Sequence, residues 1–339
     1  MSETPEIRLP DTSKLVVSSS PHLHDPSSVR KIMLTVILAL LPACAMGVFY
    51  FGWRALYVLA VCGIGCVAVE HVCCKISGKS TTSGDLSALL TGILLAMNLS
   101  ASTPWWVCII GAILAIGLAK HLYGGLGYNP FNPALVARVG LLIALPKFLT
   151  GQAWVQPQAG RIMQTAQAVT SATPLDDWKT NANVGTEYWN YFLGNMPGCI
   201  GETSAIALIL GGLVLIYLGL IRWQVPLGFI GSVAIITWIL GMTSAEPQPT
   251  PLFHLLTGGL MLGAFFMATD MVTSPITKSG ALIFGIGCGV VTAVIRLFGS
   301  YPEGVSFSIL FMNALTPLID RYTPKKAFGQ STSKQGATR

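Results

Sequence analysis

Two polar, proline-bearing stretches interrupt an otherwise apolar sequence and carry side chains that could contact a ligand. One runs from Gly124 to Ala134 and the other from Met267 to Pro275. Glycine lets a backbone approach a ligand closely, and a helix that begins at Pro133 would turn its N-terminus toward the first stretch. Such an end favours anions or dipolar rings. Each stretch is therefore a candidate binding segment, and a simple inner loop is the alternative.

A third polar stretch, from Gln167 to Leu175, is rich in hydroxyl groups. It contains Thr170, Ser171 and Thr173. A threonine hydroxyl without an adjacent base is a poor nucleophile. The residues alone therefore predict a turn with a structural role.

Several ionisable residues fall within or beside apolar segments, where they are costly and often functional. Glu70 and His71 lie near the end of such a segment, so we expect them to reach the membrane interface. Arg138 lies within a segment and is expected to pair with Glu70 or to bind an anionic ligand. A buried Glu70 or Asp270 could bind a cation, since hard cations prefer oxygen ligands.

Eight cysteines are present, and no two of them form a CxxC pair. Metal and iron–sulfur sites need ligands at matching positions, whereas a free cysteine in an apolar segment behaves as a small hydrophobic residue. The cysteines are therefore expected to be packing residues. Cys199 is expected outside the membrane with no obvious disulfide partner.

The elements that must position these residues are membrane helices. The 339-residue chain is 52% hydrophobic and 10% charged, with a mean hydropathy of +0.64. Soluble domains carry about 25% charged residues, so the composition excludes a globular soluble enzyme, a disordered chain and a coiled coil. The net charge of +6 is unevenly placed and fits membrane orientation better than nucleic-acid binding.

We expect an all-α polytopic membrane protein of about ten transmembrane helices, because lipid cannot satisfy a non-helical backbone. Leu89–Gly92 reappears as Leu255–Gly258, each in the short third segment of its half. Five spans per half predict two inverted repeats with short or broken helices, the arrangement that surrounds a midplane site. The segments are 32–51, 55–74, 86–97, 105–119 and 133–145, then 204–221, 225–241, 252–267, 281–299 and 305–319.

Lysine and arginine gather on the cytoplasmic side of membrane proteins. With both termini cytoplasmic, most of the 20 such residues fall inside, and those that fall outside are Arg54, Lys147, Arg161, Lys179 and Arg296. No cleavable signal is expected. The predicted units are a cytoplasmic arm 1–31, a first repeat 32–145, an extracytoplasmic loop 146–203, a second repeat 204–319 and a cytoplasmic tail 320–339.

Four motifs, in order along this chain, resemble those of one family. They are Ser19–His22 before the first segment, Gly127–Ala134, Ser171–Leu175 and Ala268–Pro275. The sequence resembles the D subunits of the Rnf electron-transport complexes, and more distantly the B subunits of the sodium-pumping NADH:quinone oxidoreductases. The resemblance covers nearly the whole chain.

The resemblance implies a flavoprotein component of a complex that passes electrons between ferredoxin and NAD while moving Na⁺ or H⁺ across a bacterial cytoplasmic membrane. FMN would be joined through its phosphate to Thr173 by a flavin transferase, with Thr170 and Ser171 in the recognition motif. Gln167 and Ser171 depart from the usual motif residues. Partners would be the other membrane and iron–sulfur subunits, the second FMN-bearing subunit and membrane lipid, with no nucleic acid.

The resemblance also permits a second flavin, riboflavin or another, held noncovalently in a cavity near the inner half. The residues expected to line it are Asn129, Asn132, Asp270, Thr273 and Ser274. A solute channel or carrier of the ammonium- and urea-transporter type is the alternative function, because that fold also uses inverted repeats. No pair of central histidines supports it.

Overall fold

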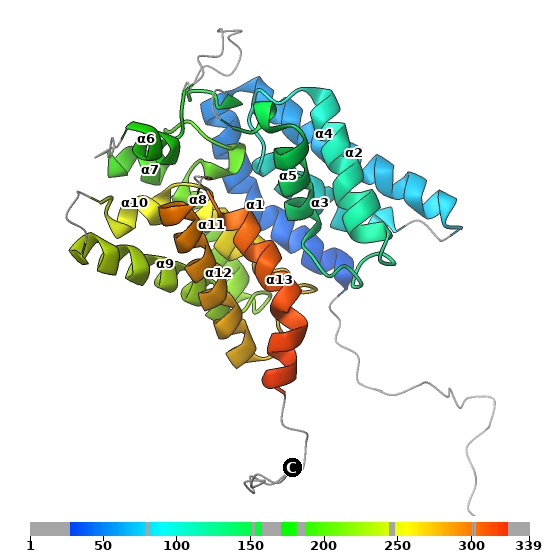
Figure 1. The fold of residues 1–339 in the computed structure, drawn as a ribbon. Coiled ribbons are helices and arrows are strands. Elements are labelled where there is room, and N and C mark those ends of the chain that lie inside the picture. Colours follow the sequence, from blue (N-terminus) through cyan, green and yellow to red (C-terminus); the bar gives the residue numbers. More distant parts are fainter. Residues whose placement is uncertain are drawn as a thin grey trace, which may run out of the picture.

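The computed structural model describes residues 28–78, 82–150, 153–157, 171–181, 187–243, 248–299, 301 and 303–324. Figure 1 shows these residues as a helical bundle. The first half contains α1 (Val29–Phe51), α2 (Trp53–Ile76), α3 (Ser87–Met97), α4 (Trp105–Ala112), which continues as a π-helix (Ile113–His121), and α5 (Pro133–Ala144).

The second half contains α8 (Ala205–Tyr217), α9 (Gln224–Thr243), α10 (Pro251–Leu256), α11 (Leu260–Leu262), which continues as a π-helix (Gly263–Met267), α12 (Lys278–Phe298) and α13 (Val305–Tyr322). All ten expected segments are therefore helical. The first begins three residues earlier than expected, because Ser28 caps α1 by accepting a hydrogen bond from the Lys31 amide. Between the halves lie α6 (Pro174–Asn181) and α7 (Tyr188–Leu193).

Four helices are long and apolar enough to cross a membrane, namely α1, α2, α9 and α12. Shorter apolar helices accompany them: α3, α4 with its π-helical extension, α5 and α8. This combination confirms a multi-pass membrane protein with short and broken helices.

The two halves use equivalent helix contacts. In the first half α2 packs on α3 and α4, and in the second α9 packs on α10 and α12. Across the halves, α1 packs on α8 and α5 packs on α13, so each of these helices contacts its counterpart. Such pairing is what a pseudo-twofold relation between two repeats requires.

The repeated Leu-Leu-Thr-Gly sequence has a different conformation in each half. Leu89–Gly92 lies inside α3, where the missing side chain of Gly92 allows close contact with the Cys62 carbonyl of α2. Leu255–Gly258 instead ends α10, and Gly258 and Gly259 adopt φ values of +72° and +64°. Glycine adopts a positive φ at little energetic cost, so two successive glycines allow this left-handed break in the helix. The first copy has a single glycine, Gly92, followed by Ile93.

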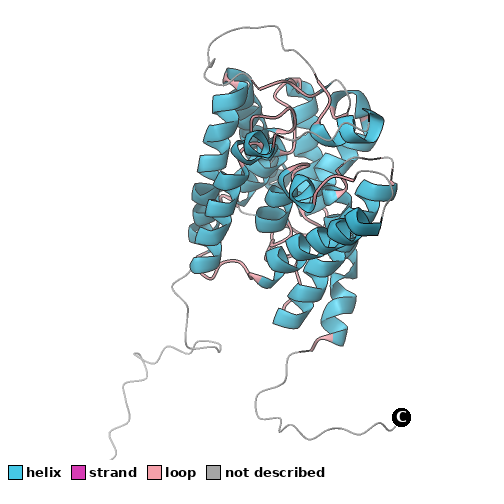
Figure 2. Ribbon diagram, turned by 90° about the vertical axis from the view of Figure 1, so that its left-hand side faces the viewer, coloured by secondary structure: helices cyan, strands magenta, loops and turns pink. Residues whose placement is uncertain are grey.

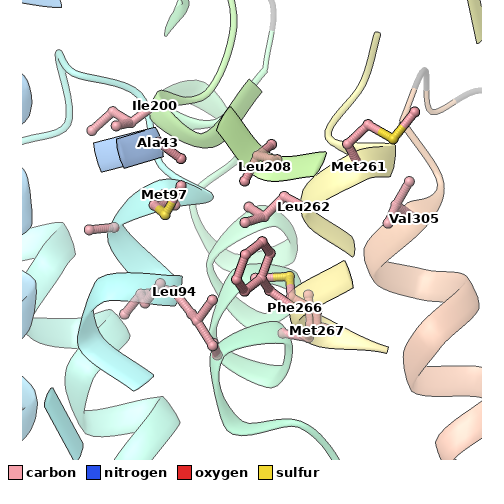
Figure 3. Packing of buried hydrophobic residues seen from close by; sticks show 14 of the residues in the cluster. Ala43, Leu94, Met97, Ile200, Leu208, Met261, Leu262, Phe266, Met267 and Val305 are labelled. Atoms are coloured by element: carbon pink, nitrogen blue, oxygen red, sulfur yellow. The ribbon is translucent and has the colours of Figure 1, made fainter. Parts of the chain in front are cut away.

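The ends of the two short third helices meet in the buried core. Met97 at the end of α3 lies near Leu262 of α11, and Phe266 and Met267 follow from the adjoining π-helix (Figure 3). Helices also pack closely at Gly285–Gly289. A Cβ atom at Gly285 would lie 2.5 Å from the Val225 carbonyl oxygen of α9.

The start of α1 and the end of α13 lie at one end of the bundle, whereas α6 and α7 lie at the other (Figures 1 and 2). The segment that carries Thr173 is therefore remote from both ends of the described chain.

Candidate functional site

A cleft, which we call the inner cleft, opens near the end of the bundle where α1 begins. Its volume is about 820 Å³ including its mouth. Its apolar walls come from α1, α3 and the π-helix after α11, including Phe265 and Phe266. Its polar lining includes Asn129, Asn132 and Asp270. The structure thus brings together three of the five residues predicted to share a cavity, although they come from both halves of the chain.

Local hydrogen bonds fix these polar side chains. Asn132 caps α5 through its side-chain oxygen and donates from Nδ2 to the Met267 carbonyl oxygen at 3.1 Å. Asn129 donates to the Phe131 carbonyl oxygen at 3.1 Å, but its buried Oδ1 has no hydrogen-bond partner among the described residues. That oxygen remains available to a ligand donor.

The other two predicted residues lie outside the cleft lining. The Thr273 hydroxyl donates to Oδ2 of Asp270 at 3.2 Å, so it orients that carboxylate without lining the cleft itself. Ser274 contributes its backbone amide to the Asp270 carbonyl oxygen at 3.1 Å. Both therefore hold the turn that carries Asp270.

The cleft also contains a buried cation, Lys120, which the sequence predicts only as one of the basic residues of the cytoplasmic side. Lys120 is 2% exposed, and its Nζ contacts the Glu70 carboxylate at 2.5 Å and the Ser87 hydroxyl at 2.6 Å. The expectation that Glu70 reaches the interface is therefore wrong, since Glu70 is fully buried, while His71 is exposed. A buried carboxylate needs a paired charge, and only the tertiary fold identifies Lys120 as that partner.

Arg138 does not pair with Glu70, which corrects that alternative. Its Nη2 donates to Glu303 Oε2 at 2.8 Å, and its guanidinium carbon lies 5.5 Å from the centre of the Trp154 ring. The side chain is 2% exposed, and Nη1 has no hydrogen-bond partner among the described residues. One buried donor therefore remains for an acceptor that the described chain does not supply.

Arg138 lines a second pocket of about 440 Å³, which we call the outer pocket. Aromatic side chains of Trp154, Tyr301 and Phe307 line it together with Asp176 and Glu303. The inner cleft reaches the start of α5 at Asn132 and Pro133, whereas the outer pocket reaches its later turns. The two cavities therefore lie toward opposite ends of α5.

The predicted attachment residue, Thr173, immediately precedes α6. Its hydroxyl accepts a hydrogen bond from the Asp176 amide at 3.2 Å, and the side chain is 4% exposed. Ser171 donates from its amide to the Trp154 carbonyl oxygen at 3.1 Å, which ties this segment to a wall of the outer pocket. Thr170 lies outside the described residues.

Contacts along α6 dock it beside the outer pocket. Leu175 is buried against Gly258, and the Trp178 ring meets the His254 ring edge-on at 5.4 Å. Lys179 Nζ donates to the carbonyl oxygens of Gly299 and Tyr301, each at 2.7 Å. These contacts hold α6 against the break after α10 and the loop between α12 and α13.

Burial changes the acid–base properties of α6. It raises the pKa of Asp176, and the neighbouring Glu303 carboxylate acts in the same direction. Burial also lowers the pKa of Lys179. Both shifts follow from the partial burial of α6 beside the outer pocket.

The eight cysteines are all free, and seven of them are buried. This confirms that they act as packing residues with no disulfide. Cys199, which was predicted on the outer side of the membrane, is itself buried: its side chain is 4% exposed, and its thiol donates to the Asn98 carbonyl oxygen at 3.4 Å.

These features define a class: a polytopic helical membrane protein with an inner cleft and an outer pocket formed by two similar halves. The model of the NQR2, RnfD, RnfE family matches residues 16–329. The chain belongs to this family.

Relatives that carry functional names match over almost their entire lengths. The chain is 44% identical over 326 residues to the D subunit of the Na⁺-translocating ferredoxin:NAD⁺ oxidoreductase complex of Acetobacterium woodii, covering 95% of this chain and 98% of that protein. It is 47% identical over 322 residues to the D subunit of the proton-translocating ferredoxin:NAD⁺ oxidoreductase complex of Clostridium ljungdahlii, covering 92% and 96%. The D subunit of the ion-translocating oxidoreductase complex of Escherichia coli (strain SE11) is 36% identical over 346 residues, covering 92% and 98%.

Proposed function

We propose that this protein is the D subunit of an Rnf-type complex, a membrane translocase that passes electrons between ferredoxin and NAD and couples their passage to ion movement. The observation that carries this proposal is the identity of 44–47% to two D subunits over at least 92% of each chain. Family membership favours this function over the solute carrier. The two relatives are named for different ions, Na⁺ and H⁺, so this similarity does not decide the coupling ion.

The proposed location is the cytoplasmic membrane of a bacterium, with both chain termini in the cytoplasm and α6 on the opposite side. The separation of α6 from the start of α1 and the end of α13 supports this orientation (Figure 2). Cysteine accessibility tests it, using single cysteines introduced at exposed Thr180 and Arg321. An impermeant thiol reagent should label only Thr180→Cys in intact cells, and labelling of Arg321→Cys alone would reverse the orientation.

The outer pocket is proposed to hold FMN that is attached covalently to Thr173. The residues fit such a group: aromatic walls suit an isoalloxazine ring, and the unpartnered Nη1 of Arg138 suits an anionic acceptor. When bound, the flavin supplies one- and two-electron redox chemistry. The protein's part is to position the ring, limit water and supply a buried positive charge.

Attachment replaces the Thr173 hydroxyl hydrogen with a phosphoryl group, giving a mass gain of one FMN less one water. Because that hydroxyl is buried against the first turn of α6, the segment must be modified before it docks or must undock for the transferase. The transferase and the remaining complex subunits are the proposed partners, and membrane lipid surrounds the helices.

In-gel flavin fluorescence tests this proposal on protein produced with a flavin transferase. The wild-type band should fluoresce after denaturing electrophoresis, and Thr173→Ala should abolish the signal. Thr180→Ala is the matched control, since Thr180 is an exposed threonine on α6, the helix that begins directly after Thr173. Fluorescence that persists in Thr173→Ala, or a wild-type mass without the added FMN, would refute attachment at Thr173.

The inner cleft is proposed to hold a second flavin noncovalently. Its walls are mainly apolar with a few polar side chains, as in ligand pockets, and its buried Asn129 Oδ1, which has no hydrogen-bond partner among the described residues, is available to accept a hydrogen bond from a ring or ribityl donor. Flavin released by denaturing Thr173→Ala protein measures this site separately from the covalent one. Asn132→Ala should reduce the released flavin, whereas Ser274→Ala, outside the cleft, should not. Equal release from both variants would contradict the assignment.

A further inference from the structure

A third, small cavity of about 290 Å³ lies where the two halves meet. The end of α3 contributes Asn98, and the break before α11 contributes Gly258 and Gly259. Two carboxylates, Glu202 and Glu303, complete its polar lining. None of these residues belongs to the inner cleft.

The two carboxylates and the thiol of Cys199 are clustered, and their reactive atoms all lie within 4.8 Å of one another. Glu202 is 6% exposed, and its Oε1 has no hydrogen-bond partner among the described residues. That atom faces the helix break, since a Cβ atom placed on Gly259 would lie 3.7 Å from it. A buried carboxylate oxygen with no donor is costly if charged.

Two arginines are near, but neither donates to the Glu202 carboxylate. Arg138 of α5 donates to Glu303, and Arg296 of α12 donates to backbone carbonyl oxygens, including that of Glu303 at 2.9 Å. The remaining neighbours are Asp176 of α6, which faces Glu303, and His254 of α10, whose carbonyl oxygen accepts from Arg296. Two fixed guanidinium charges disfavour a metal cation in the cavity, and neither forms an ion pair with Glu202, which interacts instead with the Cys199 thiol.

We propose that Glu202 binds one exchangeable proton in this cavity, beside the ionised Glu303, making it a proton-binding site between the two halves of the protein. The proton is taken from water and converts the Glu202 carboxylate to a carboxylic acid, with no change in oxidation state. Glu303 stays ionised, because Arg138 donates to it at 2.8 Å.

The electrostatics of the cluster support this assignment. Burial raises the pKa of Glu202 to about 8, and the adjacent Glu303 carboxylate contributes to the rise, while Arg138 opposes the shift. Burial also raises the pKa of the Cys199 thiol well above its ordinary value. The thiol therefore remains neutral, and Glu202 is the group in the cavity that exchanges its proton near neutral pH.

The site is linked to the outer pocket through Glu303, which lines both cavities. Negative charge added in the outer pocket repels the carboxylate pair and increases its proton affinity. This link, unlike the proton site itself, rests on the proposed flavin at Thr173.

Infrared titration of the purified full-length protein tests the proton site. The infrared spectrum of the wild type minus that of Glu202→Gln should contain a protonated-carboxyl band. This band should disappear as the pH rises, with a midpoint at a pH of about 8. Glu303→Gln should lower that midpoint by about 1 pH unit, because it removes the negative charge beside Glu202. Exposed Glu187→Gln is the control and should leave the midpoint unchanged. If Glu202→Gln does not fold, Glu202→Asp should retain a titrating band at a changed midpoint.

Two results would overturn the proton site. One is a wild-type spectrum with no titrating band that depends on Glu202. The other is a stoichiometric metal ion, or a Na⁺-dependent midpoint, that Glu202→Gln eliminates.

The flavin-free variant separates this inference from the proposed function. Thr173→Ala should keep the titration even though it has no covalent flavin. Chemical reduction should raise the midpoint in the wild type and leave it unchanged in Thr173→Ala, and equal responses would refute the link to the outer pocket.

Discussion

Replacing Arg296 should destabilise the protein, because this side chain closes the broken helix of the second half. It is fully buried at the end of α12. It donates to four carbonyl oxygens: Glu303 at 2.9 Å, His254 at 2.5 Å, Thr257 at 3.0 Å and Gly258 at 3.1 Å. Three of these belong to the end of α10 and the break that follows it, where helix carbonyls lack intrahelical partners.

The size of the effect follows from those four bonds. A hydrogen bond to a charged group contributes about 1.5–3 kcal/mol, and an unsatisfied buried carbonyl costs about 1–3 kcal/mol. The terms are not additive, and removing a buried charge also relieves its desolvation. For Arg296→Met we therefore expect a net loss of about 3–5 kcal/mol. Arg296→Lys keeps the charge without the planar fork of donors, so it should lose less.

Thermal unfolding can be followed with a thiol-reactive fluorophore, because Cys62, Cys66, Cys108 and Cys288 are fully buried in the folded protein. At roughly 2 °C per kcal/mol, the Tm of Arg296→Met should fall by about 6 °C or more. Exposed Arg321→Met is the matched control and should leave Tm nearly unchanged. An Arg296→Met protein that melts with the wild type would refute the view that this arginine holds the break.

Three further predictions use the same assay. Gly92→Ala should lower Tm, because the added Cβ atom would lie 2.6 Å from a carbonyl oxygen of α2. Gly231→Ala should leave Tm unchanged, because its Cβ atom would have no atom within 4 Å. Equal effects of the two substitutions would contradict the close packing at Gly92. Lys120→Met should lower the free energy of unfolding by about 3–5 kcal/mol, because it leaves the Glu70 charge buried and unpaired. Adding Glu70→Gln should restore part of that stability. A double variant no more stable than Lys120→Met would argue against the pair. Because the folded-state pKa of Glu202 is raised to about 8 from the ordinary 4.5, its stabilising contribution is present below pH 4.5 and is lost as the pH rises through 8. Wild-type Tm should therefore fall more steeply than that of Glu202→Gln between about pH 4.5 and 8, and parallel profiles would count against a raised pKa.

The sequence alone predicted the helices well, because in a membrane the apolar segments must be helical and their lengths are visible directly. All ten segments appear as helices, and the short third segment of the second half is indeed broken. The repeat was predictable from order and spacing. The different conformations of its two Leu-Leu-Thr-Gly copies were not predicted, although the extra Gly259 was the signal that could have revealed them.

The candidate site was predictable only where neighbouring residues share one motif. Asn129 and Asn132 were found together through their polar, proline-bearing segment, and the structure places Asp270, predicted from the second such segment, in the same cleft. Thr173 stood out by resemblance to a family motif, whose attachment role stays a prediction. Counting charges by side of the membrane gave no information on pairing, so the burial of Lys120 beside Glu70 was not predicted.

Partner choice for the buried charges was decided by the tertiary structure. Glu70 and Lys120 are 50 residues apart, and Arg138 and Glu303 are 165 residues apart. No local periodicity encodes such distances along the chain. Composition and segment length determined that this protein is a helical membrane protein, because they follow from transfer of side chains and backbone into lipid. The packing of one half against the other determined which polar groups share a dry cavity, because that depends on contacts between segments remote in sequence.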